Sequence, residues 1–305
     1  MLSFVFKRLF SAFLTLLLVS VFIFLLAHLA GDPAIAVAGK ESSAEDVERI
    51  RVHYGFDRPL VEQYFAWCGR ALSGDFGRSY HYQQTVSDML IARLPITLVL
   101  GVSALGFALL ISLPLGIFAA IRPDSLIDRI SLFIAVVGQA MPTFWFALVM
   151  IVFFGVTLRW LPISGNASWQ NFIMPTIALG YFATPTLMRL TRAGMIDALE
   201  SDYIRTARAK GLSQGSILFK HALRNVMIPI VSVSAVQFGS MLSGSIVIEQ
   251  IFALQGIGWL GYDATVRFDL PVVQAITLVI AVFYVFLTLA ADLLNAILDP
   301  RIRIG

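Results

Sequence analysis

The sequence contains little charge and a single cysteine. Charged residues make up 13% of its 305 positions, whereas 58% are hydrophobic, and the mean hydropathy is +0.82. Soluble domains carry about 25% charged residues, so this composition indicates a protein with many membrane spans. Cys68 has no partner for an intrachain disulfide, and no Cys/His spacing typical of a metal site occurs. The net charge of +3 is too small to indicate nucleic-acid binding.

Motifs of catalysis are missing as well. The chain has no Gly-x-x-x-x-Gly-Lys-Ser/Thr loop, so it lacks the backbone cradle that holds ATP phosphates. It also has no nucleophile elbow and no His-Glu-x-x-His sequence. We therefore expect no catalytic residue, no metal site and no cofactor in this chain.

Six segments are apolar over about the 20 residues that a helix needs to cross the hydrocarbon core. They run over residues 9–30, 96–121, 130–158, 173–190, 227–252 and 272–297. The fourth is the shortest and contains Pro175 and Pro185. No Ala-x-Ala-like cleavage site precedes His28, so the first segment is interpreted as a retained span. The sequence predicts an all-α membrane protein with six transmembrane helices.

The distribution of Lys and Arg predicts the orientation. Basic residues lie before the first predicted span, between the second and third, between the fourth and fifth, and after the sixth; they are Lys7, Arg8, Arg122, Arg129, Arg192, Arg205, Arg208, Lys210, Lys220, Arg224, Arg301 and Arg303. The two short opposite connections hold only Arg159 and Arg267. Both termini are thus predicted to be cytoplasmic.

Three regions follow: residues 1–30, a helical subdomain at 31–94 on the outer side, and a five-helix core at 95–305. In the subdomain, Ser42–Glu45 fits a capping box, and Gly55 closes the helix that follows. A second helix is expected to begin with Asp57 as its cap, with Tyr64, Trp67 and Leu72 on one face, and a third at Thr85. Such a subdomain either contacts a soluble partner or covers the ends of the spans.

Residues 200–225 form the most informative cytoplasmic connection. Its first part favours a helix up to Gly211, where glycine ends helices readily, and Ser213 is a suitable cap for a second helix. A short, basic surface helix of this kind can enter a groove on another protein.

The order of residues here resembles a known family. Tyr203-Ile-Arg-Thr-Ala-Arg-Ala-Lys-Gly-Leu212, followed by His221-Ala-Leu-Arg-Asn225, is similar to the cytoplasmic signature of dipeptide and oligopeptide ABC-importer permeases, the inner-membrane components of binding-protein-dependent transport systems. Arg205 and Thr206 stand where the general motif has Glu and Ala, whereas Ala207 and Gly211 match it. Further similar stretches begin at Gly74, Arg93, Ile248, Asp269 and Asp299.

The resemblance implies a type I permease that moves di- or oligopeptides from periplasm to cytoplasm; relatives serve nickel complexes, glutathione or sugars. It implies a sister permease, two P-loop ATPase subunits that carry ATP and Mg, and a periplasmic binding protein, all at a bacterial inner membrane. The residues expected to contact the ATPase are Tyr203, Arg205, Thr206, Ala207, Lys210, Gly211 and Leu212.

Polar residues and prolines within the spans are candidates for the translocation path. They are Gln139, Pro142, Thr143, Gln237 and Glu249. A buried amide needs a partner, so the glutamines line the path or make interhelical hydrogen bonds. Glu249 either meets a peptide amino group or pairs with a neighbour such as Arg267.

Two other classes compete with this interpretation. A proton-coupled secondary transporter would show inverted repeats and carboxylates in mid-membrane, and the sequence shows neither clearly. An intramembrane enzyme would need a nucleophile or a metal-binding set within the spans. Both are less favoured than an importer subunit.

Overall fold

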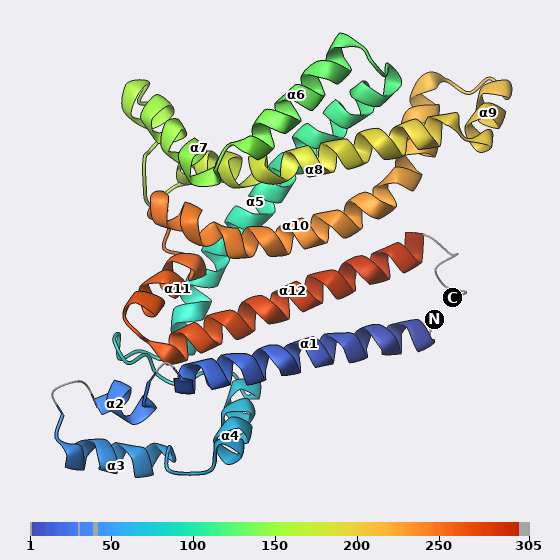
Figure 1. Ribbon diagram of the computed structural model, residues 1–305. Coiled ribbons are helices and arrows are strands. Elements are labelled where there is room, and N and C mark those ends of the chain that lie inside the picture. The colour runs from blue at the N-terminus through green and yellow to red at the C-terminus, as the bar shows by residue number, and fades with distance from the viewer. Residues whose placement is uncertain (1, 30, 39–41, 299–305) are drawn as a thin grey trace.

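The computed structural model describes residues 2–29, 31–38 and 42–298, and helices form every regular element among them (Figure 1). The long helices are α1 (Leu2–Leu29), α5 (Val86–Ile121), α8 (Ile173–Glu200), α10 (Leu223–Ile251) and α12 (Leu270–Leu298). The shorter ones are α2 (Pro33–Ala38), α3 (Ala44–Tyr54), α4 (Leu60–Leu72), α6 (Leu126–Ala140), α7 (Thr143–Met150), α9 (Asp202–Ala209) and α11 (Ile257–Val266). Two π-helices, η1 (Ile151–Thr157) and η3 (Ser216–Ala222), and one 3₁₀-helix, η2 (Trp169–Phe172), are also present. The all-α prediction is confirmed for the described residues.

Four helical segments in the described part of the chain are long and apolar enough to cross a membrane. They are Phe6–Leu29, Val86–Ile121, Ser216–Ile251 and Leu270–Leu294, and the bent pair of α6 and α7–η1 adds a fifth if it counts as one span. The predicted span at 173–190 falls within α8, which is not among them. Four to five apolar spans are thus present, and a count of six stays a prediction.

The third predicted span is not a continuous helix. Residues 126–140 and 143–157 form two helical segments that meet at 101°. Met141 has extended backbone angles, φ −86° and ψ 126°, and Pro142 follows it. Proline disfavours a helical conformation in the residue before it and supplies no backbone donor, so the helix ends there. The span predicted over 130–158 is therefore broken at Pro142, and its crossing of the membrane as one span stays a prediction.

Helix α5 is longer than the second predicted span. It begins after Thr85, whose Oγ1 accepts a hydrogen bond from the Asp88 backbone N–H at 3.3 Å, as expected for a cap. It then continues through Pro95 and Pro114 without a break. The ten residues before Ile96 extend the helix by about 15 Å, since an α-helix rises 1.5 Å per residue. The sequence predicted the helix start but not its continuity with the span.

The centre of the bundle is the contact between α5 and α8. Small residues let the two backbones approach closely: a Cβ added at Gly180 would lie 2.4 Å from the Ala104 carbonyl oxygen, and one at Gly116 would lie 2.6 Å from the Thr191 Cβ. Ala104, Ala183 and Leu187 are buried in the same core. Small residues at such crossings are the usual means of packing membrane helices. Helix α8 is therefore surrounded by protein, which explains its lower hydropathy.

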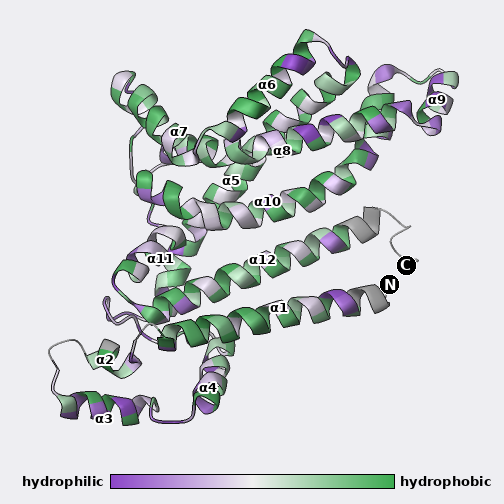
Figure 2. Cartoon of the chain, in the orientation of Figure 1, coloured by the Kyte–Doolittle hydropathy of each residue, from purple (hydrophilic) through white to green (hydrophobic). Residues whose placement is uncertain are grey.

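Different helices lie at the two ends of the bundle (Figure 1). The first residues of α1, the last of α12 and all of α9 lie at one end, and α2, α3 and α11 lie at the other. Helices α1 and α12 pack together and are joined by an ion pair between Arg8 and Asp292 at 2.8 Å. Hydrophobic colour covers most of α1, whereas α3 and α9 are more polar (Figure 2). Arg301, Arg303 and the family-like stretch from Asp299 lie outside the described residues.

The segment at 31–94 contains helices at the expected places, with shifted starts. Ser43, and not Ser42, caps α3, because its Oγ accepts from the Asp46 backbone N–H at 3.2 Å. Helix α4 begins after Pro59 and not at Asp57. Gly55 ends α3 with φ +72°, as predicted. Leu72 is 90% exposed and does not share the inward face of Tyr64 and Trp67.

Replacing Gly180 with Ala is expected to lower the free energy of unfolding by about 1–3 kcal/mol, the usual cost of overpacking. The added methyl group meets the Ala104 carbonyl oxygen, a backbone atom that cannot move aside easily. Gly106→Ala on α5 is the control, because nothing lies within 4 Å of its added Cβ. Thermal unfolding in detergent measures both, and equal midpoints for the two variants would contradict the close α5–α8 contact.

Candidate functional site

Helix α9 lies across the end of α8 and is held there by two side chains. Ser201 ends α8 and precedes the first residue of α9, so the chain changes direction at this residue. Ile204 is fully buried, and Ala207, one turn later, is 6% exposed. Because positions i and i+3 lie on one face of a helix, α9 presents a narrow apolar face to the bundle. Ala207, predicted as an ATPase contact, therefore points into the protein.

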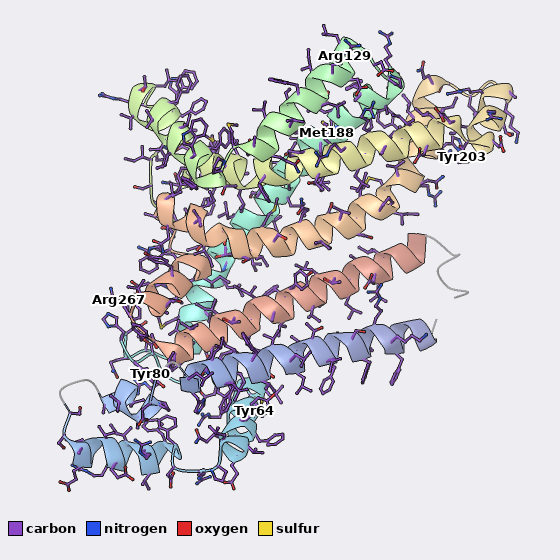
Figure 3. The ribbon with its side chains drawn as sticks, in the orientation of Figure 1. Tyr64, Tyr80, Arg129, Met188, Tyr203 and Arg267 are labelled. Atoms are coloured by element: carbon purple, nitrogen blue, oxygen red, sulfur yellow. The ribbon has the colours of Figure 1, made fainter. Side chains whose placement is uncertain are left out.

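The other predicted contact residues lie on the exposed side of this segment. Tyr203 is 42% exposed and projects from α9 (Figure 3). Arg205 pairs with Asp202 at 3.0 Å, and Thr206 donates from its Oγ1 to the Asp202 carbonyl oxygen. Lys210 and Leu212 are also exposed. Six of the seven predicted residues thus form one accessible surface, named here the α9 surface: Tyr203, Arg205, Thr206, Lys210, Gly211 and Leu212.

The turn after α9 has the geometry that the sequence predicts. Gly211 adopts φ +76°, a conformation that favours glycine. Its N–H donates to the Arg208 carbonyl oxygen at 3.0 Å, and the Leu212 N–H donates to that of Ala207 at 3.3 Å. The Ser213 Oγ then accepts from the Ser216 N–H at 3.4 Å, just before η3. The helix stop and the second helix cap are both confirmed.

Two hollows lie between α9 and the bundle. One has a volume of about 420 Å³ and the other about 440 Å³. Both are lined by Ile121 of α5, Leu199 of α8 and Arg208 of α9. Helix α9 is therefore anchored at Ile204 and Ala207 and stands clear of the bundle on its Arg208 side.

At the opposite end, Glu249 is fully buried and joins three helices. Its Oε1 accepts hydrogen bonds from Thr97 of α5 at 2.7 Å and from Ser245 of α10 at 3.1 Å. Its Oε2 accepts from the Trp259 backbone N–H of α11 at 2.8 Å. Thr97 in turn accepts from the Ile257 N–H at 2.9 Å. We name this group of residues the Glu249 latch.

Glu249 pairs with neighbours other than Arg267, and its contact with a peptide amino group stays a prediction. Arg267 does not reach it, because Arg267 donates to Asp263 at 2.8 Å and contacts the His81 Nε2 at 2.8 Å. The α11 backbone packs directly on this carboxylate, since a Cβ added at Gly256 would lie 2.5 Å from Glu249 Oε2. In the described structure this carboxylate holds α11 to α5 and α10.

A second buried carboxylate secures the loop before α5. Asp269, 1% exposed, accepts from the Ser79 hydroxyl and from the backbone N–H groups of Tyr80 at 3.1 Å and His81 at 3.3 Å. Tyr80 and Arg267 accordingly lie close to the same end of the molecule (Figure 3). This loop is thereby fixed to the connection between α11 and α12.

Asp263 on α11 adds a third set of polar contacts at this end of the molecule. It accepts from the Tyr82 hydroxyl at 2.6 Å and pairs with Arg267 at 2.8 Å. Burial acts to raise the pKa of Asp263, but the Tyr82 hydrogen bond and the Arg267 charge outweigh it and hold the pKa below its usual value. The pKa of Tyr82 is raised by burial and by the Asp263 carboxylate. Asp263 is thus ionised at neutral pH and ties the loop to α11.

The remaining path candidates are spread over three helices. Gln139, near the end of α6, accepts from Arg189 Nη1 of α8 at 2.9 Å, which is an interhelical hydrogen bond. Pro142 and Thr143 lie at the bend before α7, and Gln237 is half-buried on α10. Neither of the two hollows beside α9 is lined by any of them. The path through these residues stays a prediction.

Sequence reasoning missed a buried ion pair between α6 and α8. Arg192 donates from Nε and Nη2 to the two oxygens of Asp128, each at 2.6 Å, and the Asp128 side chain is 2% exposed. Arg192 was predicted to lie in the connection after the fourth span, whereas α8 continues to Glu200. The only signal in the sequence was the place of Asp128 in the first turn of a helix that Ser125 could cap, and nothing there indicated Arg192 as its partner.

The described ranges 2–29, 31–38 and 42–298 contain no group of three or more His, Cys, Asp or Glu side chains that could hold a metal. Their grouped polar residues instead form hydrogen bonds and ion pairs between helices, as in the Glu249 latch.

Glu249→Gln is expected to destabilise the protein by about 1–3 kcal/mol, because both carboxylate oxygens accept from donors and the amide NH₂ must face one of them. Glu200→Gln is the control, since Glu200 is exposed. Thermal unfolding in detergent checks the difference. A Glu249→Gln midpoint equal to that of the control would show that the latch contributes nothing.

Comparison with known proteins agrees with this geometry. A family model described as the binding-protein-dependent transport system inner membrane component matches residues 112–304, and its N-terminal companion matches residues 1–101. The glutathione transport system permease protein GsiC of Escherichia coli strain K12 is 40% identical over 304 residues, with 99% of each chain covered. GsiC of Shigella dysenteriae serotype 1 shows the same identity and coverage.

Solved structures share the helical arrangement. A chain of the inward-facing MetNI methionine ABC transporter matches with a TM-score of 0.55 and 20% identity, over 69% of this chain and 96% of that one. A chain of an amino acid ABC transporter with histidines matches with a TM-score of 0.50 and 18% identity, over 70% and 94% of the two chains. At these identities the likeness concerns the fold alone. The two family matches together with the relatives at 40% identity establish that the chain belongs to the inner membrane components of binding-protein-dependent transport systems, and is an ABC importer permease subunit and not an enzyme.

Proposed function

We propose that this permease passes a di- or oligopeptide, with glutathione-like tripeptides included, from periplasm to cytoplasm and is driven through the α9 surface by separate ATPase subunits. The observation that carries the proposal is the α9 surface itself. It combines exposed Tyr203 and Arg205 with only two buried anchors. Side chains that contact so little of their own chain are available to a partner.

The proposed topology has six spans, with α8 as the span that is buried in protein. Both termini face the cytoplasm, and α2–α4 and α11 face the periplasm. In support, α9 lies at the same end as the first turns of α1, which carry Lys7 and Arg8 (Figure 1). Basic residues favour the cytoplasmic side of a bilayer.

The proposed coupling follows from chain connectivity. Helix α9 is joined to α8 at Ser201 and to η3 and α10 through Gly211 and Ser213. A displacement of α9 by an ATPase therefore reaches two long helices at once. ATP and Mg are bound by the ATPases, and a binding protein delivers the solute to a pair formed with a sister permease. Tilting of packed helices as rigid bodies is a common form of such switching.

The relatives give the substrate class its support. The permeases 40% identical over the full chain are named for glutathione transport, and glutathione is a tripeptide. Nickel complexes and sugars are the alternatives within the same kind of importer. A proton-coupled transporter is disfavoured by the carboxylates that the bundle holds: Glu249 is occupied by hydrogen bonds, and Asp128 is paired with Arg192.

Arg205→Glu is expected to abolish stable assembly of the ATPase on the permease while leaving insertion and folding intact, because Arg205 is 72% exposed and pairs only with its own helix neighbour Asp202 among the salt bridges of the described residues. Co-purification of the ATPase measures the effect. Arg49→Glu is the matched control: Arg49 is equally 72% exposed and pairs with Asp46 three residues before it, at the other end of the molecule. Loss of the ATPase in both variants, or in neither, would contradict the coupling role.

Uptake into proteoliposomes tests the function as a whole. The permease, its sister, the ATPases and the binding protein are reconstituted with labelled glutathione or a labelled dipeptide. We expect accumulation that needs ATP and stops with an ATPase variant that cannot hydrolyse it. Uptake driven by a proton gradient without ATPases would overturn the proposal. ATP-driven uptake of a nickel complex or a sugar in place of peptides would overturn its substrate class.

A further inference from the structure

Helix α4 lies beside the apolar part of α1 and not beyond its end. The Tyr64 hydroxyl shares a hydrogen bond with Ser20 at 2.8 Å, and the Tyr64 and Trp67 rings pack on Phe24 at centroid distances of 5.4 and 6.0 Å. The apolar segment of α1 continues to Leu29. Ser20 is nine residues before that end, or about 14 Å along the helix axis. Helix α4 thus meets α1 at a depth where α1 is surrounded by lipid.

The picture shows how α4 runs relative to α1. It crosses the direction of α1 and does not follow it (Figure 1), and Tyr64 lies next to α1 (Figure 3). Residues 63, 64 and 67 make the contacts, so the crossing is near the middle of α4. A helix that crosses a span in this way lies in the plane of the membrane.

The exposed surface of α4 is divided into an apolar and a polar side. Val61 and Phe65 are 65% and 67% exposed, and Leu72, two turns further on, is 90% exposed. These positions recur at i, i+4 and i+11, which places them on one side of the helix, and we name them the α4 stripe. Glu62, Ala66 and Arg70 are also exposed and recur at i, i+4 and i+8 on a different side.

The contacts with α1 show which side faces the middle of the membrane. Gln63 reaches His28, near the end of α1, with 3.0 Å between Gln63 Oε1 and His28 Nε2. Tyr64 reaches Ser20, eight residues deeper and about 12 Å along α1. Viewed down the axis of α4, Gln63 lies next to Arg70 on the polar side. Tyr64 lies next to the α4 stripe. The stripe therefore faces along α1 toward the middle of the membrane. Glu62 and Arg70 face the opposite way, toward the Leu29 end of α1.

We infer that α4 is an in-plane helix embedded in the lipid leaflet around the Leu29 end of α1, with the α4 stripe against the hydrocarbon and Glu62 and Arg70 toward water. The occupant of the stripe is phospholipid, because the stripe faces along α1 toward Leu17 and Phe13, exposed residues one and two turns deeper than Ser20 on the face of α1 that contacts α4. Helices of this composition bind at the boundary between headgroups and acyl chains. Tyr64 and Trp67 suit the same level of the bilayer. The inference depends on the insertion of α1 and not on the proposed solute or the ATPase contact.

Spin-label accessibility in lipid nanodiscs tests this placement on the assembled transporter. Cys68 is first replaced by Ser, which leaves a background without cysteine. Single cysteines then replace Val61, Phe65 and Leu72, and Glu62 and Ala66 serve as matched positions on the outward side. We expect nitroxides on the stripe to be relaxed by oxygen and shielded from a water-soluble nickel chelate, and those at 62 and 66 to show the reverse.

Two results would overturn the inference. Equal access of the nickel chelate to both sides would place α4 in water. Shielding of the stripe from oxygen and nickel alike would show that protein covers it. Neither result bears on ATP-driven uptake, so the two proposals fail separately.

A pair of adjacent charge substitutions gives a second measurement. Phe65→Glu places a carboxylate on the stripe, whereas Ala66→Glu places one on the outward side. A charge in hydrocarbon is costly. We expect the thermal midpoint in nanodiscs to fall for Phe65→Glu and not for Ala66→Glu, and equal midpoints would count against embedding.

Discussion

The close approach of α5 and α8 is the contact on which the rest of the structure depends. Gly180 and Gly116 bring the two helices together at distances that a single methyl group on either glycine would prevent. Around this pair, α6 and α10 pack on α8, and α9 continues from its end. A helix held inside the bundle by small residues needs little hydrophobic surface of its own. The same helix can therefore carry polar side chains, and Arg192 and Arg189 both make interhelical hydrogen bonds from it.

Buried charge in this protein is used to join helices. Glu249, Asp269 and Asp128 are each almost fully buried, and each is saturated by donors from other elements. A buried carboxylate is tolerated when hydrogen bonds or a counter-charge replace the water that it loses. The first two secure α11 and the loop before α5, and the third secures α6 to α8. Helices α4 and α9 are among the parts that none of these three carboxylates fastens, and their exposed side chains are the ones that we propose contact lipid and a partner.

The sequence predicted those features that depend on local rules. Long apolar runs located α1, α5, α10 and α12, because contact with lipid demands apolar side chains along the whole helix. Gly211 and Ser213 predicted the end of α9 and the start of the next helix, since their effects depend on neighbouring backbone groups only. The prolines were less informative. Pro95 and Pro114 leave α5 intact and Pro142 ends α6, and this difference depends on the surrounding structure and not on the residue type. The hydrogen-bond partner of Glu249 could not be predicted from the sequence either. Thr97 is 152 residues away, and only the fold brings it near.

Helix α9 is anchored by Ile204 and Ala207 alone, and its remaining side chains contribute little to the stability of the bundle. Apart from Gly211, whose φ of +76° favours glycine, the residues of the α9 surface are therefore little constrained by folding. A cell with several related importers needs each permease to recruit its own ATPases and to refuse those of its paralogues. Because two buried positions keep the helix in place, the exposed positions that we propose contact the ATPases can diverge between paralogues until cross-assembly is lost, without any change in the membrane part of the transporter.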